Sequence, residues 1–323
     1  MTIPAWAQQM DQLAAEGIPF LFVLDFELVD PYVIPLKEIE QTHEAGIQFQ
    51  INNTKSETSP STREINFSKI PVSLEVYRHG FNQVMKAIKA GDTYLLNLCY
   101  STQMIGLPSL KEIFEVVSAP YKLYLPGKFV VFSPEQFVSI EDGIIRTFPM
   151  KGTIDAALSD AEAVLLADIK EQEEHATVVD LLRNDLSIVS RKVTVDQYRY
   201  ISKITTPIKS LLQCSSAISG ILEDEYVDKP GSIMHALLPA GSVTGAPKKK
   251  TVELITTIEP EPRGYYTGVF GVFDGKNLDS AVMIRMIEER ADGFYYRSGG
   301  GITYRSVAEQ EYQELMDKVY TPV

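Results

Sequence analysis

Hydrophobic residues recur along the chain with two periods, and each period predicts one type of element. Near the N-terminus the apolar run PFLFVLDFE, residues 19–27, predicts a strand that follows a first helix. The run TYLLNLCYST, residues 93–102, predicts a second strand. Between them, a helix that ends at Gly91 is predicted by one stripe of apolar side chains, Val76, Phe81, Val84, Met85 and Ile88.

The second half of the chain is dominated by alternating patterns. Residues 129–147 read as a strand pair that turns at Asp142-Gly143, and residues 265–304 read as a meander that turns at Asp274-Gly275 and Asp292-Gly293. Helices are predicted over 159–190, from Ala246-Pro247 onward, and over 307–320.

These elements do not follow a βαβ rhythm, so we expect the α+β class, with a large, mainly antiparallel β-sandwich flanked by helices. The polar stretch at residues 52–64 lacks periodicity, and we expect it to be a mobile surface loop.

Composition narrows the class of protein. Of 323 residues, 45% are hydrophobic and 23% are charged, as is ordinary for a globular protein. Apolar runs fall short of the ~20 residues that cross a bilayer, and the N-terminus does not resemble a signal peptide, so we expect a cytoplasmic protein without membrane contact. The net charge of −13 argues against nucleic-acid binding, because phosphates need basic partners. The spacing of Cys99 and Cys214 indicates neither a metal site nor a redox pair.

Two predicted helices each carry a pair of carboxylates three residues apart. Glu171 and Glu174 form the first pair, and Glu311 and Glu314 form the second. This spacing puts both members of a pair on one helical face. If the two faces met, the carboxylates would suit a hard cation such as Mg²⁺. The alternative interpretation is that each pair is a solvated acidic face.

Lys151 stands between an alternating apolar run and Gly152 in the stretch PMKGT. An amine at the end of a strand, beside a residue without a side chain, is well placed to act as a covalent nucleophile. The alternative is a solvated surface lysine.

Two glycine-containing segments and one arginine are further candidates. RSGGGITY, residues 297–304, carries Gly299, Gly300 and Gly301, whose N–H groups can approach an anion, although a tight turn is the simpler interpretation. AGSVTGAPKKK, residues 240–250, is a second such loop that enters a helix. Arg285 lies in an apolar strand pattern, where it must pair with an acid or bind a carboxylate.

The segments PMKGT, EEHATVVDLLRNDL, GSVTGAPK, DSAVMIR and GGGITYRS follow one another in the order typical of chorismate-utilising enzymes. The chain resembles that family over residues 75–320. Lysine in PMKGT resembles the aminodeoxychorismate synthase component I branch, whereas anthranilate synthases usually carry alanine there. The resemblance implies one catalytic domain over 1–323, with 1–74 as a shortened N-terminal part. It implies a transferase of p-aminobenzoate and folate biosynthesis that aminates chorismate at C4.

The resemblance also implies a role for each candidate. Lys151 would form a covalent adduct with the chorismate ring, and Glu135 in SPEQF would act on the departing hydroxyl. Glu174 and Glu314 would bind Mg²⁺, with Glu171 and Glu311 acting directly or through water. Contacts to the substrate are implied for Gly152, Thr153, Thr244, Tyr266, Arg285, Gly299, Gly300, Gly301 and Lys318.

Other members of the family remain as alternatives. Isochorismate synthases have a lysine base near the position of Leu95, and leucine disfavours water addition. Ser210 replaces a histidine that the family has near its site. Anthranilate synthase, isochorismate synthase and a non-catalytic chorismate-binding relative stay open. The stretches around both cysteines lack a glutaminase motif, so ammonia is expected from a separate glutamine amidotransferase subunit or from solution.

Overall fold

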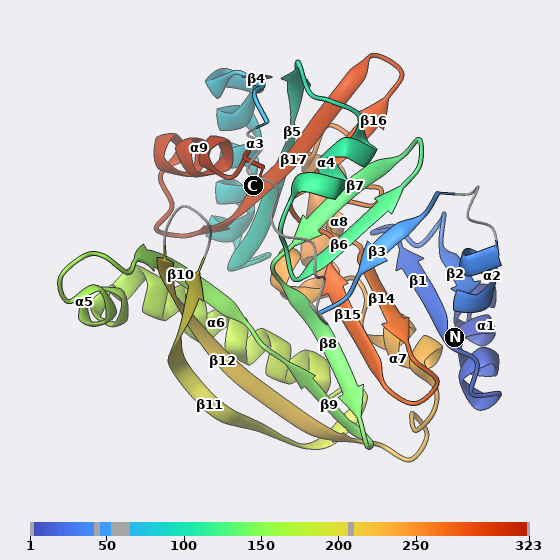
Figure 1. The fold of residues 1–323 in the computed structure, drawn as a ribbon. Coiled ribbons are helices and arrows are strands. Elements are labelled where there is room, and N and C mark those ends of the chain that lie inside the picture. Colours follow the sequence, from blue (N-terminus) through green and yellow to red (C-terminus); the bar gives the residue numbers. More distant parts are fainter. Residues whose placement is uncertain (1–2, 42–45, 53–64, 206–209, 322–323) are drawn as a thin grey trace. The chain divides into compact units, whose positions relative to one another are not determined.

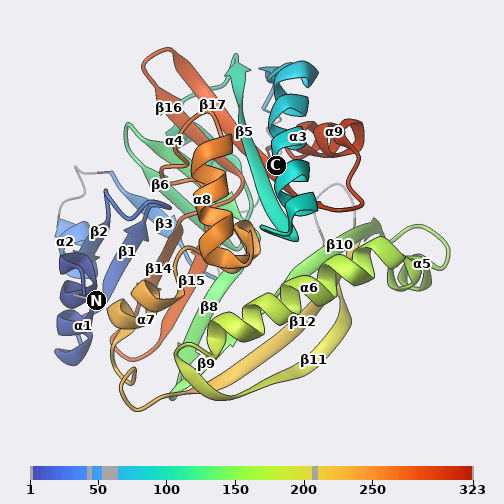
Figure 2. The ribbon, with the colours of Figure 1, turned by 180° about the vertical axis from the view of Figure 1, so that it is seen from behind.

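The computed structural model describes residues 3–41, 46–52, 65–205 and 210–321. The chain divides into two compact units, each built from three separate segments. Unit 1 contains Met1–Leu21, Glu135–Leu238 and Gly271–Ser280, and unit 2 contains Phe22–Pro134, Pro239–Phe270 and Ala281–Val323. Figure 1 follows the chain through both units, and Figure 2 gives the reverse view. The single domain over 1–323 stays a prediction.

Unit 1 consists of antiparallel strands and the helices that accompany them. Its helices are α1 (Ala5–Ala15), α5 (Ala161–Ala167), α6 (Ile169–Leu186) and α7 (Pro230–Leu237). Its strands are β8 (Gln136–Glu141), β9 (Ile144–Thr147), β10 (Met150–Asp155), β11 (Ser190–Thr205) and β12 (Ser210–Leu222). Strands β1 (Phe20–Leu24), β14 (Val269–Phe273) and β15 (Leu278–Val282) contribute residues to both units.

Unit 2 has a sheet of its own. Its helices are α2 (Leu36–Gln41), α3 (Leu74–Ala90), α4 (Leu110–Val116), α8 (Lys248–Ile258) and α9 (Ala308–Asp317), with a 3-10 turn, η2, at Gly241–Val243. The strands of this sheet are β3 (Gln48–Gln50), β4 (Ser68–Ile70), β5 (Leu95–Ile105), β6 (Tyr121–Leu125), β7 (Phe129–Ser133), β13 (Gly245–Ala246), β16 (Met286–Arg290) and β17 (Gly293–Thr303). Strand β2 (Tyr32–Pro35) also lies in the segments of unit 2, but it pairs with β1.

In unit 1 the strand order β10-β12-β9-β8-β15 places the PMKGT segment at one end of the row, and β11 pairs with β12 as well. Helix α6 packs against β10, β11 and β12 (Figure 2). The helix is distinct from α5 because Asp168 caps it, with a side-chain oxygen that accepts a hydrogen bond from the N–H of Glu171. This packing brings the acidic pair of α6 to the strand that carries Lys151.

In unit 2 the strand order is β13-β5-β17-β16-β7-β6-β3, and β4 pairs with β5. Helices α3, α8 and α9 bury apolar side chains against β5 and β17, around a core that includes Tyr77, Phe81 and Leu96. A second core lies between α4 and strands β7, β16 and β17. The long central pair β5–β17 therefore carries apolar support and also holds the glycine segment.

The α+β class with antiparallel sheets and accompanying helices is confirmed. Some local predictions were wrong. Val76 is exposed, and Tyr77, four residues before the buried Phe81, takes the buried position on α3. The predicted strand pair at 129–147 is three strands, and the helix over 159–190 is two. The loop predicted at 52–64 lies almost wholly outside the described residues. Among those that are described, helices are too short or too polar to cross a membrane.

Candidate functional site

Lys151 lies at the second position of β10, beside an irregularity in the strand pairing. It is opposite Cys214 of β12, whereas Thr153 is opposite Gln213, so the register shifts between Lys151 and Thr153. The extra residue is Gly152, which has a φ of 72°. Glycine adopts this left-handed conformation at little cost. Lys151 is half-buried. The sequence pattern predicts Lys151 at the end of a strand, and this prediction was wrong because the residue lies at the start of β10.

Glu171 approaches the same bulge from the first turn of α6. A β-carbon on residue 152 would lie 3.0 Å from Glu171 Oε2 and 2.9 Å from Leu165 Cδ1. The bulge and the helix therefore pack this closely because Gly152 has no side chain. Glu174 lies one turn later on α6 and is half-buried.

His175 is buried on α6 and was missed by the sequence analysis. Its Nε2 lies 2.7 Å from Ser216 Oγ, which also accepts a 3.0 Å hydrogen bond from the N–H of Arg199. Burial, with the positive charges of Arg199 and Lys151, lowers the pKa of His175 to about 4. The ring is therefore neutral at pH 7 and adds no positive charge beside Lys151. Its signal in the sequence is its position four residues after Glu171, on the same helical face.

The three consecutive glycines lie inside β17. Gly299, Gly300 and Gly301 are opposite Cys99, Leu98 and Asn97 of β5. A β-carbon at Gly299 would lie 2.5 Å from the Cys99 sulfur, so the two strands approach too closely there for a larger residue. The glycines therefore continue the strand, and contact between their N–H groups and a substrate stays a prediction.

Gly300 faces the acidic pair of α9. A β-carbon there would lie 3.6 Å from Glu311 Oε2, 3.7 Å from Glu314 Oε1 and 3.8 Å from Lys318 Nζ. Lys318 Nζ lies 2.7 Å from Glu314 Oε1 and donates a 2.8 Å hydrogen bond to the carbonyl of Gly299. The glycines, the acidic pair and Lys318 thus come together within unit 2.

The sequence pattern predicts Arg285 within a strand, but the residue lies in the break between β15 and β16. Its φ is 56°, a conformation that costs energy for any residue except glycine. Its Nε donates to the hydroxyl of Tyr320 at 3.3 Å, and the Tyr320 ring centre lies 5.2 Å from the guanidinium carbon. This strained turn aims the guanidinium at an exposed aromatic side chain that the sequence analysis did not select.

Tyr266 is 4% exposed. Burial raises its pKa well above the usual value, Cys99 adds to the increase, and the positive charges of Arg263 and Arg285 oppose it. Tyr266 and Arg285, which the sequence analysis assigns to the same substrate carboxylate, therefore lie in one electrostatic neighbourhood of unit 2.

Thr244 is fully buried, and its hydroxyl donates to the carbonyls of its own loop, 3.0 Å from Ala240 O and 3.2 Å from Gly241 O. Leu95, which the sequence pattern sets against the lysine expected in isochorismate synthases, is buried in β5, and its Cδ1 lies 3.0 Å from the position of a β-carbon at Gly301. Both residues therefore adjoin the segments that carry other candidates.

Glu135 lies between β7 and β8 and is half-buried, and Thr153 is exposed on β10. The structure thus forms two local groups of candidates. One, in unit 1, contains Lys151, Gly152 and Glu171; the other, in unit 2, contains the glycines, Glu311, Glu314 and Lys318, with Tyr266 and Arg285 in the same unit.

Carboxylate oxygens, the ligands that Mg²⁺ prefers, are present in both groups. Burial raises the pKa of Tyr77, and the charges of Glu311 and Glu314 raise it further. The donor chemistry fits Mg²⁺. Within the described residues, however, no three His, Cys, Asp or Glu side chains gather as a ready metal site.

Known proteins resemble the chain over part or all of its length. It is 47% identical over 323 residues to an "Uncharacterized PabA-like protein" of Haemophilus influenzae, covering 100% of this chain and 98% of that one. It is 34% identical over 262 residues to aminodeoxychorismate synthase component 1 of Bacillus subtilis. That match covers 75% of this chain and 54% of that protein. It is also 34% identical over 236 residues to anthranilate synthase component 1 of Spirochaeta aurantia, covering 69% of this chain and 47% of that protein.

A solved structure, the putative 2,3-dihydroxybenzoate-specific isochorismate synthase DhbC of Bacillus anthracis, has the same fold. The TM-score is 0.74 at 20% identity, over 98% of this chain and 87% of that one. The family model for chorismate binding enzymes matches residues 26–323. The chain therefore belongs to the chorismate binding enzyme family.

Proposed function

We propose that this chorismate binding enzyme aminates chorismate at C4 with ammonia and forms 4-amino-4-deoxychorismate, a precursor of p-aminobenzoate and folate. The observation that carries the proposal is the placement of Lys151. Lys151 lies at a bulge whose Gly152 packs against the carboxylate of Glu171, and its charge is close enough to His175 to lower that residue's pKa. A lysine that served only solubility would need none of these surroundings.

Lys151 supplies the nucleophile in the proposed reaction. Its neutral amine adds to ring carbon C2, the ring double bonds shift, and the C4–O bond breaks. The departing hydroxyl takes a proton from Glu135 and leaves as water. Ammonia then adds to C4, the C2–N bond breaks, and Lys151 leaves as a neutral amine, while the new ammonium group at C4 returns a proton to Glu135. Chorismate and ammonia are consumed, and aminodeoxychorismate and water are formed.

Unit 2 supplies the groups proposed to hold the anionic substrate. Arg285 and Tyr266 would bind one carboxylate, and Lys318 with the N–H groups of Gly299–Gly301 would bind another. Thr153 and Thr244 are assigned to the ring. Local cations of this kind are needed because the net charge of −13 repels a dianion.

Mg²⁺ is the proposed cofactor. Glu314 and Glu311 of α9, and Glu174 and Glu171 of α6, are the side chains that would hold it. Bound Mg²⁺ would neutralise charge on a substrate carboxylate. Lys318 now occupies Glu314, so this lysine is expected to turn from the carboxylate to the substrate when the cation binds.

The ammonia is proposed to come from a separate glutamine amidotransferase subunit. Both cysteines are buried, and burial raises the pKa of Cys99 to about 12, which keeps the thiol protonated and unreactive. Neither cysteine is therefore suited to attack glutamine.

The purified chain should be incubated with chorismate, Mg²⁺ and either ammonium at alkaline pH or glutamine, with products separated by chromatography and identified by mass. We expect 4-amino-4-deoxychorismate from ammonium and none from glutamine. Anthranilate would identify an anthranilate synthase, and isochorismate would identify an isochorismate synthase. Recovery of chorismate unchanged, although it binds, would favour a non-catalytic relative.

A further inference from the structure

Arg263 and Glu259 form a buried ion pair at the end of α8 in unit 2. Arg263 Nη2 lies 2.6 Å from Glu259 Oε1, and Nε lies 2.9 Å from Oε2, so both carboxylate oxygens are engaged. The side chains are 1% and 4% exposed. Burial lowers the pKa of Arg263, but Cys99 and Glu259 outweigh it and raise the pKa overall, so the guanidinium stays charged. A buried charge of this kind needs a full set of partners.

The remaining donors of Arg263 reach two backbone segments next to candidate substrate residues. Nη1 donates to the carbonyl of Val243 at 2.7 Å and to the hydroxyl of Thr267 at 3.2 Å. Val243 directly precedes Thr244, and Thr267 directly follows Tyr266. One guanidinium therefore ties together the two loops that carry Thr244 and Tyr266.

The ion pair also reaches β5. Arg263 Nη2 donates to the carbonyl of Asn97 at 2.7 Å, and Glu259 Oε1 accepts a 3.0 Å hydrogen bond from the N–H of Cys99. Asn97 is opposite Gly301 and Cys99 is opposite Gly299 in the β5–β17 pairing. The glycine segment is thus held against a strand that the pair anchors at two points.

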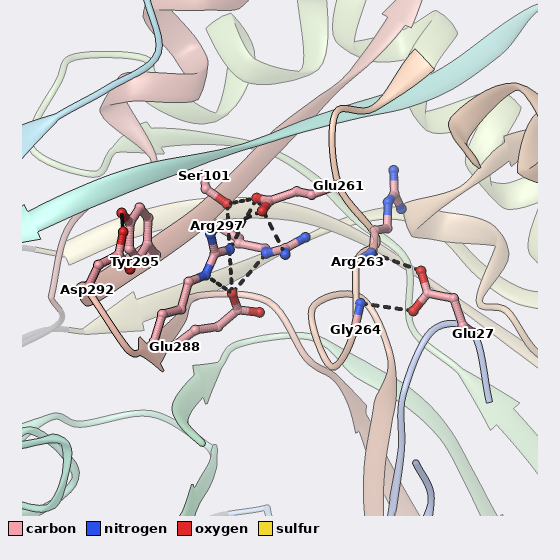
Figure 3. A network of polar contacts seen from close by, with 10 residues as sticks. Glu27, Ser101, Glu261, Arg263, Gly264, Glu288, Asp292, Tyr295 and Arg297 are labelled. Atoms are coloured by element: carbon pink, nitrogen blue, oxygen red, sulfur yellow. Dashed lines mark hydrogen bonds and ion pairs between the residues drawn. The ribbon is translucent and has the colours of Figure 1, made fainter. Parts of the chain in front are cut away.

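Thr267 shows why this anchoring is needed. It is a β-branched residue with a φ of 62°, a conformation that Thr adopts only when its surroundings impose it. Its N–H donates to the carbonyl of Met283 at 2.8 Å, and its hydroxyl accepts from Arg263. The backbone N–H of Arg263 is itself held by Glu27 at 2.9 Å (Figure 3). These contacts fix the direction in which Tyr266 leaves the chain.

We propose that the Arg263–Glu259 pair positions the chorismate-binding residues Thr244, Tyr266 and Gly299. It does so by holding the three backbone segments that carry them. This inference rests on the proposed function of those residues, and neither Arg263 nor Glu259 need touch the substrate.

A separate ionic network in unit 2, which includes Glu261, Glu288 and Arg297, provides a matched control (Figure 3). Arg290 bonds to Glu261, Glu288 and Ser101, and its side chain is 27% exposed. Its partners are strand and loop side chains and not the backbone beside Thr244 or Tyr266. Arg290→Lys is therefore expected to leave the KM for chorismate at the wild-type value.

The test uses two variants. Arg263→Lys keeps the charge but cannot donate to both carboxylate oxygens of Glu259 at once. The second is the double variant Arg263→Met/Glu259→Met. The double variant removes both charges at once, so no unpaired charge remains buried and its Tm should exceed that of Arg263→Met alone. We expect both variants to bind chorismate on the order of tenfold more weakly by calorimetry, and to raise KM more than they lower kcat.

Two results would overturn the proposal. One is a double variant that recovers the wild-type KM together with its Tm. The other is a core variant, Ile113→Ala in α4, that matches Arg263→Lys in Tm and raises KM equally. Chorismate binding is measured by calorimetry, independently of activity. A protein that binds chorismate without aminating it would therefore refute the proposed function, and the binding constants of the variants would still test the role of the Arg263–Glu259 pair. A protein that does not bind chorismate would overturn both.

Discussion

Glu171 and Gly152 lie so close that a single added methyl group on residue 152 would be 3.0 Å from the carboxylate oxygen Oε2. The contact joins the first turn of α6 to the bulge that follows Lys151. The absence of a side chain therefore lets the carboxylate of Glu171 approach the backbone next to the candidate nucleophile Lys151.

Gly152→Ala is expected to destabilise the protein by more than about 1 kcal/mol, because the left-handed backbone and the contacts with Leu165 and Glu171 both oppose a β-carbon. Urea denaturation measures the change. The control is Gly143→Ala, which has a φ of 74° but open space around the β-carbon. Equal losses in the two variants would show that the contact with α6 contributes nothing.

Lys151→Ala should abolish aminodeoxychorismate formation while the protein remains folded, because the proposed covalent step uses the Lys151 amine. Lys151→Arg keeps the positive charge and should be inactive as well, since guanidinium is a poor nucleophile. Product analysis by mass, with circular dichroism as the folding control, measures both. Activity in either variant near the wild-type rate would contradict the covalent mechanism.

Glu314→Gln should weaken the binding of Mg²⁺ and of chorismate together, because the carboxylate is proposed to hold the cation next to the substrate. Titration calorimetry with each ligand, with and without the other, measures this coupling. Glu309→Gln on the same helix is the control, since Glu309 is exposed and pairs with Arg78. The cofactor assignment fails if chorismate binds wild-type protein equally well without Mg²⁺.

Stability should fall as the pH drops from 6.5 to about 4, in part because of His175. Burial, Arg199 and Lys151 lower the pKa of His175 in the folded state to about 4, whereas the unfolded chain has the usual value near 6.5. The unfolded state therefore binds the additional proton first, which costs at most about 3 kcal/mol of stability by pH 4.

His175→Gln should reduce this slope of unfolding free energy against pH, measured in urea at several pH values. His79 is exposed, so His79→Gln should leave the slope unchanged. The same slope in wild type and His175→Gln would contradict the assignment to His175.

Elements whose local signals agree with their packing were predictable from the sequence. Helix α3 begins where Ser73 accepts a hydrogen bond from the N–H of Val76 and ends at Gly91, which has a φ of 81°. The Asp142-Gly143 turn joins β8 and β9 with both residues in the left-handed region. Caps and turns of this kind depend on a few adjacent residues, so a sequence pattern suffices to find them.

Positions set by distant neighbours were not predictable in the same way. Arg285 reads as part of a strand, but its positive φ interrupts the ladder, and that angle depends on contacts with remote residues such as Phe132. Arg263 has one partner nearby in the sequence, Glu259, but its hydrogen bonds to the carbonyls of Asn97 and Val243 reach distant parts of the chain. Identification of the candidate residues came from ordered motifs, whereas their support by buried ion pairs required the structure.

The three segments of unit 1 alternate along the sequence with the three segments of unit 2. During synthesis on the ribosome, neither unit is therefore complete until its last segment has been made. Strand β5 is made early, but its partner β17 is among the last elements to emerge, so Cys99 cannot pair with Gly299 until then. The nascent chain must carry an apolar strand with an open edge through most of translation. We therefore expect a slow folding phase that reflects this late closure.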